Sequence, residues 1–172
     1  MAMTLPSQRS GTAHRVLVGA VGGAIAGMTM AMMAMLWSAA AGTGFWMPLQ
    51  MIASLPLGQM PTSIALGTAI PVGLISHMML SMMFGIVFVA LLAVLPALRA
   101  SSAVVVITAS VFGTMLWIVN FYGIAPALGR TWFTSADAVQ QFVTHTIGFG
   151  TVLGLYAVRS MGHSHDGHSH DH

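Results

Sequence analysis

Histidine recurs at the carboxyl end of the chain with a spacing suited to metal binding. The last ten residues, HSHDGHSHDH, contain the sequence HSHD twice. The candidate ligands are five histidines and two aspartates, namely His163, His165, His168, His170, His172, Asp166 and Asp171. Neutral imidazole binds Zn, Ni, Co or Cu ions, and carboxylates can complete the coordination shell. Because HSHDGHSHDH lacks apolar residues, we expect the tail, 161–172, to be disordered without metal and to bind a divalent transition metal; a solubilising polar terminus is the alternative.

Two more histidines, His77 and His145, stand in long apolar stretches. If both stretches are membrane helices that run inward, each histidine lies about 9 Å below the outer boundary at the rise of an α-helix. Two histidines at one depth could share a site, and Asn120 lies at a slightly shallower level on a third stretch. The sequence therefore predicts an intramembrane polar site formed by His77, His145 and Asn120.

The chemistry of this polar site stays open at the level of the sequence. Two imidazoles can bind a transition metal or haem iron, relay a proton, or form hydrogen bonds that only fix helix packing. No spacing signature of a haem site accompanies them, so haem is not expected. An ionisable group inside a membrane is nevertheless a functional candidate by default.

Methionine supplies a second possible set of metal ligands, since the chain contains 16. Met28, Met32 and Met35 fall on one face of the first apolar stretch, and the second stretch adds Met78, Met79, Met82 and Met83. Soft thioethers select Cu(I), so these residues could form a copper-binding route. Methionine is also a flexible filler of apolar cores, so packing is the alternative explanation.

The composition places these residues in an integral membrane protein. Of the 172 residues, 56% are hydrophobic and 5% charged, and the mean hydropathy is +0.86. Crossing about 30 Å of hydrocarbon takes about 20 apolar residues as a helix. Four segments are long enough, near 16–41, 71–95, 102–122 and 139–158. We expect an all-α, four-helix membrane bundle over 16–160, without the alternation of a membrane β-barrel.

The arginines predict the orientation of this bundle, because Lys and Arg are enriched in cytoplasmic segments. Arg9 and Arg15 precede the first span, Arg99 lies between the second and third, and Arg159 follows the fourth, whereas Arg130 falls on the other side. Both termini are therefore expected to be cytoplasmic. Residues 1–15 lack the features of a cleaved signal peptide and are expected to be retained. Loop 42–70 would face outward, as a simple cap or as a short interfacial helix near 48–56.

Glycines at intervals of four residues predict close helix contacts. The first span carries Gly19, Gly23 and Gly27, and the fourth carries Gly150 and Gly154. Small residues at this spacing let membrane helices approach each other closely. The contacts could form within the bundle or between protomers.

Several function classes are not supported by the sequence. Cysteine is absent, so thiolate ligands and disulfides are excluded. The chain has no phosphate-binding glycine loop, no HExxH and no plausible Ser/His/Asp arrangement, so we do not expect an enzyme. No Asp, Glu, Lys or Arg lies within the body of the spans, which disfavours a carboxylate-coupled transporter. The arginines mark membrane boundaries, so no nucleic-acid partner is implied.

Three segments resemble the YagU-type family of bacterial inner-membrane proteins: SHMMLSMMFGIVF at 76–88, WIVNFYGIAPAL at 117–128 and THTIGFGTVLGL at 144–155. The resemblance implies a bacterial cytoplasmic membrane location and draws attention to His77 and His145. One family member is linked to acid resistance. The present chain differs from it in a shorter outer loop, a high methionine content and the terminal histidine repeat.

Three functional hypotheses follow from the sequence. The first is a small membrane protein that handles or senses a divalent transition metal, with the tail as buffer and His77 and His145 as the membrane site. The second is a non-catalytic accessory or structural subunit, docked on a larger membrane complex or forming a homo-oligomer through its glycines. The third is a pH-responsive stress protein whose histidines titrate near neutral pH.

Overall fold

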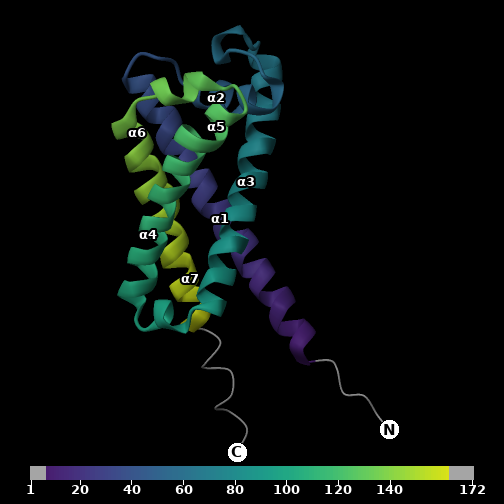
Figure 1. Cartoon of the computed structure of the whole chain (residues 1–172), viewed down its shortest axis with the longest axis vertical. Coiled ribbons are helices and arrows are strands. Elements are labelled where there is room, and N and C mark those ends of the chain that lie inside the picture. Colours follow the sequence, from purple (N-terminus) through teal and green to yellow (C-terminus); the bar gives the residue numbers. More distant parts are fainter. Residues whose placement is uncertain (1–6, 163–172) are drawn as a thin grey trace, which may run out of the picture.

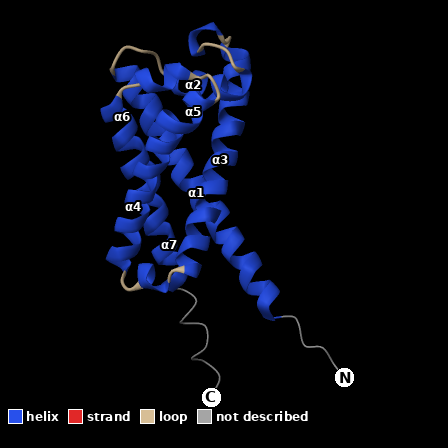
Figure 2. Ribbon diagram, in the orientation of Figure 1, coloured by secondary structure: helices blue, strands red, loops and turns tan. Residues whose placement is uncertain are grey.

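The chain forms a bundle of four long helical runs, seen in a computed structural model that describes residues 7–162 and the side chains of 11–160 (Figures 1 and 2). Within these residues there is no strand. The runs are α1 (Ser7–Ala40); α3 (Leu66–Val94); α4 (Ser102–Ile118) with η3 (Val119–Ile124) and α5 (Ala125–Ala127); and α6 (Ala138–Val143) with η5 (Thr144–Thr151) and α7 (Val152–Gly162). They alternate in direction along the bundle. The predicted all-α class is thus confirmed for the described residues.

Three runs in the described part of the chain are long and apolar enough to cross a membrane. They are Gly11–Ala40, Leu66–Val94 and Ser102–Ala127, with mean hydropathies of 1.9, 2.3 and 2.1. Large apolar side chains also cover the outside of the bundle, as Ile75 and Ile107 illustrate. In water such a surface would aggregate, whereas lipid solvates it. The chain is therefore a helical membrane protein.

The fourth run, α6–η5–α7, is helical throughout but more polar in its first half, with Gln140, Gln141, Thr144 and His145. Three of these four side chains are buried against the other runs, and Gln141 is half-buried. Burial of polar side chains inside a bundle is compatible with a membrane location, because the groups find partners in protein and not in lipid. This run lies beside α4 in Figure 1.

The described chain starts and ends at the same end of the bundle (Figure 1). The short turn η2 (Pro96–Arg99) lies there as well, so this end carries Arg15, Arg99 and Arg159, and we call it the arginine end. Arg130 lies at the opposite end. The predicted grouping of these arginines is thus seen in the fold, and the positive-inside rule predicts that the arginine end faces the cytoplasm.

Glycines bring α1 and α3 into backbone contact. The helices are antiparallel, and Gly19, Gly23 and Gly27 of α1 face Gly85, Ser81 and His77 of α3 in turn. A Cβ atom built on Gly19 would lie 2.6 Å from Cα of Ile86, closer than real Cβ contacts. The glycines of the first run therefore pack within the chain.

A second glycine contact joins α4 to the fourth run. Gly150 lies against the carbonyl of Ala109, and a Cβ atom built on Gly154 would lie 2.8 Å from Cα of Val106. Two hydroxyl pairs reinforce the contact: Ser110 Oγ with Thr151 Oγ1 and Thr114 Oγ1 with Thr146 Oγ1, each at 2.8 Å. Hydroxyl pairs between helices are a common means of joining membrane helices. Gly150 and Gly154 therefore also act inside the bundle.

The end of the bundle opposite the arginine end is covered by a roof, which consists of α2 (Met47–Leu57), η1 (Pro61–Ser63) and η4 (Thr131–Ser135). The short helix expected near 48–56 is present as α2. Trp132 Nε1 donates to Ser54 Oγ at 2.9 Å, and Arg130 Nε donates to the Leu55 carbonyl at 3.2 Å. These bonds join the two connections of the roof, so it is an ordered cap on the bundle.

The helical runs extend beyond the expected spans. The second was expected to begin at Pro71, but α3 begins at Leu66, and the third continues past residue 122 to Ala127. A proline beyond the first turn lacks the N–H that would bond to the carbonyl four residues earlier, but membrane helices tolerate such a proline. Pro71 lies in the second turn of α3, so it removes one bond without ending the helix.

Candidate binding cavity

A cavity of about 480 Å³ lies beneath the roof, between the four runs. Its lining includes His77 from α3, Asn120 from η3 and His145 from η5, so the structure places the three residues of the predicted polar site around one space. Phenylalanines and methionines make up much of the remaining wall. A mostly apolar cavity of a few hundred cubic ångströms with a few convergent polar groups is typical of a ligand site.

His77 is held by a hydrogen bond across the tightest helix contact. The side chain is 6% exposed, and its Nε2 donates to the Gly27 carbonyl at 2.8 Å. The carbonyl can only accept, so the proton resides on Nε2 and Nδ1 keeps its lone pair. Nδ1 has no hydrogen-bond partner among the described residues.

His145 is held in the opposite tautomer. Its side chain is also 6% exposed, its Nδ1 donates to the Gln141 carbonyl at 2.9 Å, and the Phe121 ring meets the imidazole edge-on at a centroid distance of 5.5 Å. The proton therefore resides on Nδ1 and the lone pair on Nε2, which has no partner within the described part of the chain. Each histidine thus keeps one basic nitrogen uncommitted.

Two π-helical segments carry polar residues of the site. Asn120 belongs to η3 and His145 to η5. The π-helix is rare in proteins, but those that occur are often found at functional sites. Its wider turn shifts one residue out of the α-helical pattern. In η5 the hydroxyl of Thr151 donates to the Thr146 carbonyl at 3.1 Å, which gives this widened turn an extra bond. The sequence contained no signal from which either π-segment could be predicted.

The methionines divide into two groups that the sequence did not separate. Those that line the cavity are Met30, Met35, Met47, Met51 and Met83. Met83 is also 46% exposed, whereas Met28, Met32 and Met79, which are 49%, 47% and 62% exposed, do not line the cavity. Of the three methionines that the sequence places on one face of the first run, only Met35 therefore lines the cavity, while Met28 and Met32 lie on the outer side of α1.

Sequence reasoning also missed a polar group at the roof end of the fourth run. Asp137 accepts from Gln140 N at 2.7 Å and caps α6, and Asp137 lines the cavity. The Gln140 side chain is buried and donates to the Ala34 carbonyl at 3.0 Å and to Ser38 Oγ at 3.1 Å. Asp137, Gln141 and His145 recur every four residues, and that spacing was the available signal for a polar helix face.

We expect Gln140→Leu to destabilise the bundle by about 1–2 kcal/mol, because two hydrogen bonds between helices are lost and each is worth about 0.6 kcal/mol or somewhat more in membrane proteins. The measurement is reversible unfolding in mixed micelles. Val139→Ala, at the neighbouring exposed position, is the matched control and should change stability little. Equal effects of the two variants would contradict the assigned role of Gln140.

The predicted ligands of the tail, from His163 to His172, lie outside the described residues. Over 7–162, no group of three or more His, Cys, Asp or Glu side chains is positioned to hold a metal ion. A zinc-type site built from such side chains is therefore not formed within the described bundle. The other donor groups that line the cavity with the two histidines are thioethers, amides, hydroxyls and the carboxylate of Asp137, which already accepts a hydrogen bond from Gln140 N.

Comparison with protein-family models, with curated proteins and with solved structures finds no match to this chain. The resemblance to the YagU-type family stays a prediction.

Proposed function

We propose that this protein is an integral membrane protein that binds a soft transition-metal ion, Cu(I), in the cavity beneath the roof. The observation that carries the proposal is the state of the two histidines. Each donates one ring N–H to a main-chain carbonyl, and histidines that bind metals usually have their second nitrogen held in this way. His77 Nδ1 and His145 Nε2 would be the ligands.

The surrounding donors favour a soft ion over a hard one. Neither cysteine nor a third histidine is available in the described part of the cavity, whereas five methionines line it. Thioether and imidazole ligands together suit copper, and thioethers select its Cu(I) state. The proposal therefore replaces the divalent ion expected for the membrane site with Cu(I), while a divalent ion remains the expectation for the tail.

In this proposal all four runs cross the bacterial cytoplasmic membrane, with the arginine end inside. The cavity then lies in the outer half of the membrane, and the tail from His163 to His172 lies in the cytoplasm. The two metal sites are on opposite sides and cannot share an ion. The protein would handle or sense copper, with the cavity as the binding site and the tail as a separate buffer.

Removal of the tail separates the two sites. The full chain and a chain ending at Gly162, both purified without metal-affinity chromatography, are loaded with Cu(I) under reducing conditions or with Zn(II). We expect both chains to retain one Cu(I) ion and only the full chain to retain Zn(II). Loss of Cu(I) retention along with the tail would contradict the proposed site in the membrane.

The two methionine groups offer a second test with a built-in control. Combined replacement of Met35, Met47 and Met51 by leucine is expected to weaken Cu(I) binding by about tenfold or more, the scale reported for removing groups that support a metal site. Leucine conserves volume, so packing should change little. The same replacement of Met28, Met32 and Met79 on the outer surface should leave Cu(I) affinity unchanged. Equal behaviour of the two triple variants in a Cu(I) competition titration would count against thioether ligation.

The size of the cavity favours one alternative function. About 480 Å³ is far more than a bare ion needs, and it falls in the range of small-molecule sites. Both uncommitted ring nitrogens accept hydrogen bonds, so an organic ligand would have to be apolar and carry donors such as hydroxyl groups. Mass spectrometry of organic extracts from the purified protein would detect it, with His77 and His145 variants as controls.

The hypotheses of an accessory subunit and of an acid-stress protein remain predictions as well. Native purification tests the first, since a stoichiometric partner protein would support it and a lone copper-binding chain would oppose it. Acid survival of cells that carry His77 and His145 variants tests the second.

A further inference from the structure

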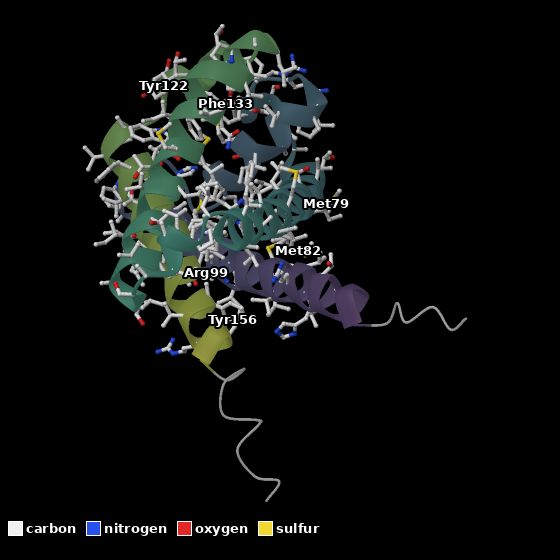
Figure 3. All side chains as sticks on the ribbon, turned by 60° about the horizontal axis from the view of Figure 1, so that its bottom comes forward. Met79, Met82, Arg99, Tyr122, Phe133 and Tyr156 are labelled. Carbon is white, nitrogen blue, oxygen red and sulfur yellow. The ribbon has the colours of Figure 1, made fainter. Side chains whose placement is uncertain are left out.

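A second hollow, of about 160 Å³, lies at the arginine end between α1, α3 and α7. In Figure 1 the first turns of α1 diverge from α3 at this end of the bundle. The apolar floor of the hollow is formed by the half-buried side chains of Val18, Val89 and Ala93, and its rim includes Arg15 and Arg99. Figure 3, which brings this end of the molecule forward, labels Arg99.

The two arginines carry positive charge that the described part of the chain does not neutralise. Arg15 comes from α1 and Arg99 from η2, and both side chains are exposed. Neither makes a hydrogen bond or ion pair with a described residue. The acidic residue of the described part, Asp137, caps α6 beside the cavity and the roof, at the far end of the bundle. The rim therefore attracts anions.

The combination of floor and rim identifies the class of anion. Guanidinium groups bind phosphate through paired hydrogen bonds, but a free phosphate ion gains nothing from an apolar floor. An anionic phospholipid uses both parts, since its phosphate meets the arginines while the start of an acyl chain covers the floor. Basic pockets between membrane helices at the cytoplasmic side are known to bind such head groups.

We propose that the hollow lined by Arg15 and Arg99 is a binding site for the head group and upper acyl chain of an anionic phospholipid of the inner leaflet. The positive-inside rule accounts for arginines near this boundary in general. It does not account for two arginines from separate elements at the rim of one apolar hollow. The site is independent of the cavity and of the proposed copper binding.

The test uses the full chain reconstituted in nanodiscs of phosphatidylcholine with a minor fraction of phosphatidylglycerol. The protein is then extracted with detergent, and native mass spectrometry measures the phosphatidylglycerol that stays bound. We expect the double variant Arg15→Gln/Arg99→Gln to retain phosphatidylglycerol about thirtyfold more weakly, the effect of two interfacial arginines. The control is Arg159→Gln, which removes one charge at the same end but does not line the hollow. It should reduce retention only slightly.

Three results would overturn the proposal. The first is equal retention by the double variant and the Arg159→Gln control, which would indicate attraction by bulk charge alone. The second is displacement of the lipid by millimolar inorganic phosphate, which would assign the hollow to a free anion. The third is retention that appears only when the chain ends at Gly162, which would show that the tail fills the hollow in the intact protein. The stability of each variant to unfolding in phosphatidylcholine alone is the folding control. A stability equal to that of the unsubstituted chain excludes misfolding as the cause of weaker lipid retention.

Discussion

The double variant His77→Ala/His145→Ala is expected to lose Cu(I) binding by at least about 100-fold. Removal of a single supporting partner of a metal-binding histidine already costs about 10–100-fold in affinity, and this variant removes both proposed nitrogen ligands. The measurement is competition with a Cu(I) chelator in detergent under reducing conditions. Each single variant should show a smaller loss, because the other imidazole and the thioethers remain.

The matched control is His14→Ala, which removes an exposed histidine at the arginine end. It should leave Cu(I) affinity unchanged. The experiment also separates a metal site from simple packing. His77→Ala removes the hydrogen bond to Gly27 and should lower stability by about 1 kcal/mol in either case, whereas Cu(I) affinity should fall only if the histidines bind the metal. A fall in stability with full retention of Cu(I) would show that the two histidines only fix the helices.

The sequence was sufficient to predict the class and the helical runs, for a simple physical reason. Apolar segments as long as 71–95 have no other stable form in lipid than a helix, because their backbone groups must be satisfied internally. The ends of the runs were less predictable. Proline was taken as the start of the second span, yet Pro71 lies inside α3, because membrane helices tolerate a proline in their interior.

The candidate site was partly predictable, because polar residues are rare in such segments. His77, His145 and Asn120 stood out on that ground, and the structure brings all three to one cavity. The sequence could not show which methionines face the cavity and which face lipid. A helix that is apolar on every side has no polar stripe that would distinguish its lipid-facing side from its interior side. Met32 and Met35 lie only three residues apart in α1, yet only Met35 lines the cavity.

A cap with a short helix near 48–56 was expected from the sequence and is present as α2, but the contacts that hold this roof in place and the two π-segments could not be predicted. Whether α2 covers the bundle depends on contacts between distant residues, such as Trp132 with Ser54. In the widened turn η5, the carbonyl of His145 likewise lies against Gly113 of α4. Neither contact has a local sequence signature, so only the folded chain reveals them.

Substitution of Gly23 by alanine is expected to destabilise the bundle by about 3 kcal/mol, the upper end of the cost of overpacking. A Cβ atom at this position would collide with the main chain of α3, including the Ser81 carbonyl, and would lie 3.0 Å from Cα of Met82. Main-chain atoms cannot move aside without separating the helices. The control is Gly67→Ala on α3, where a Cβ atom meets nothing within 4 Å; alanine there should be neutral or slightly stabilising.

The same contact provides a sharper test through Ser81, because the obstacle changes from main chain to side chain one turn further along α1. A Cβ atom at Gly27 would lie 2.5 Å from Cβ of Ser81, so Ser81→Gly should relieve much of the damage caused by Gly27→Ala. It should not relieve Gly23→Ala, whose obstacle is the backbone. In double-mutant cycles measured by unfolding in micelles, we therefore expect a favourable coupling above about 1 kcal/mol for the Gly27/Ser81 pair and about zero for the Gly23/Ser81 pair. Equal couplings would mean that α1 and α3 do not meet in this register, and the hydrogen bond that orients His77 toward the cavity would then lose its structural basis.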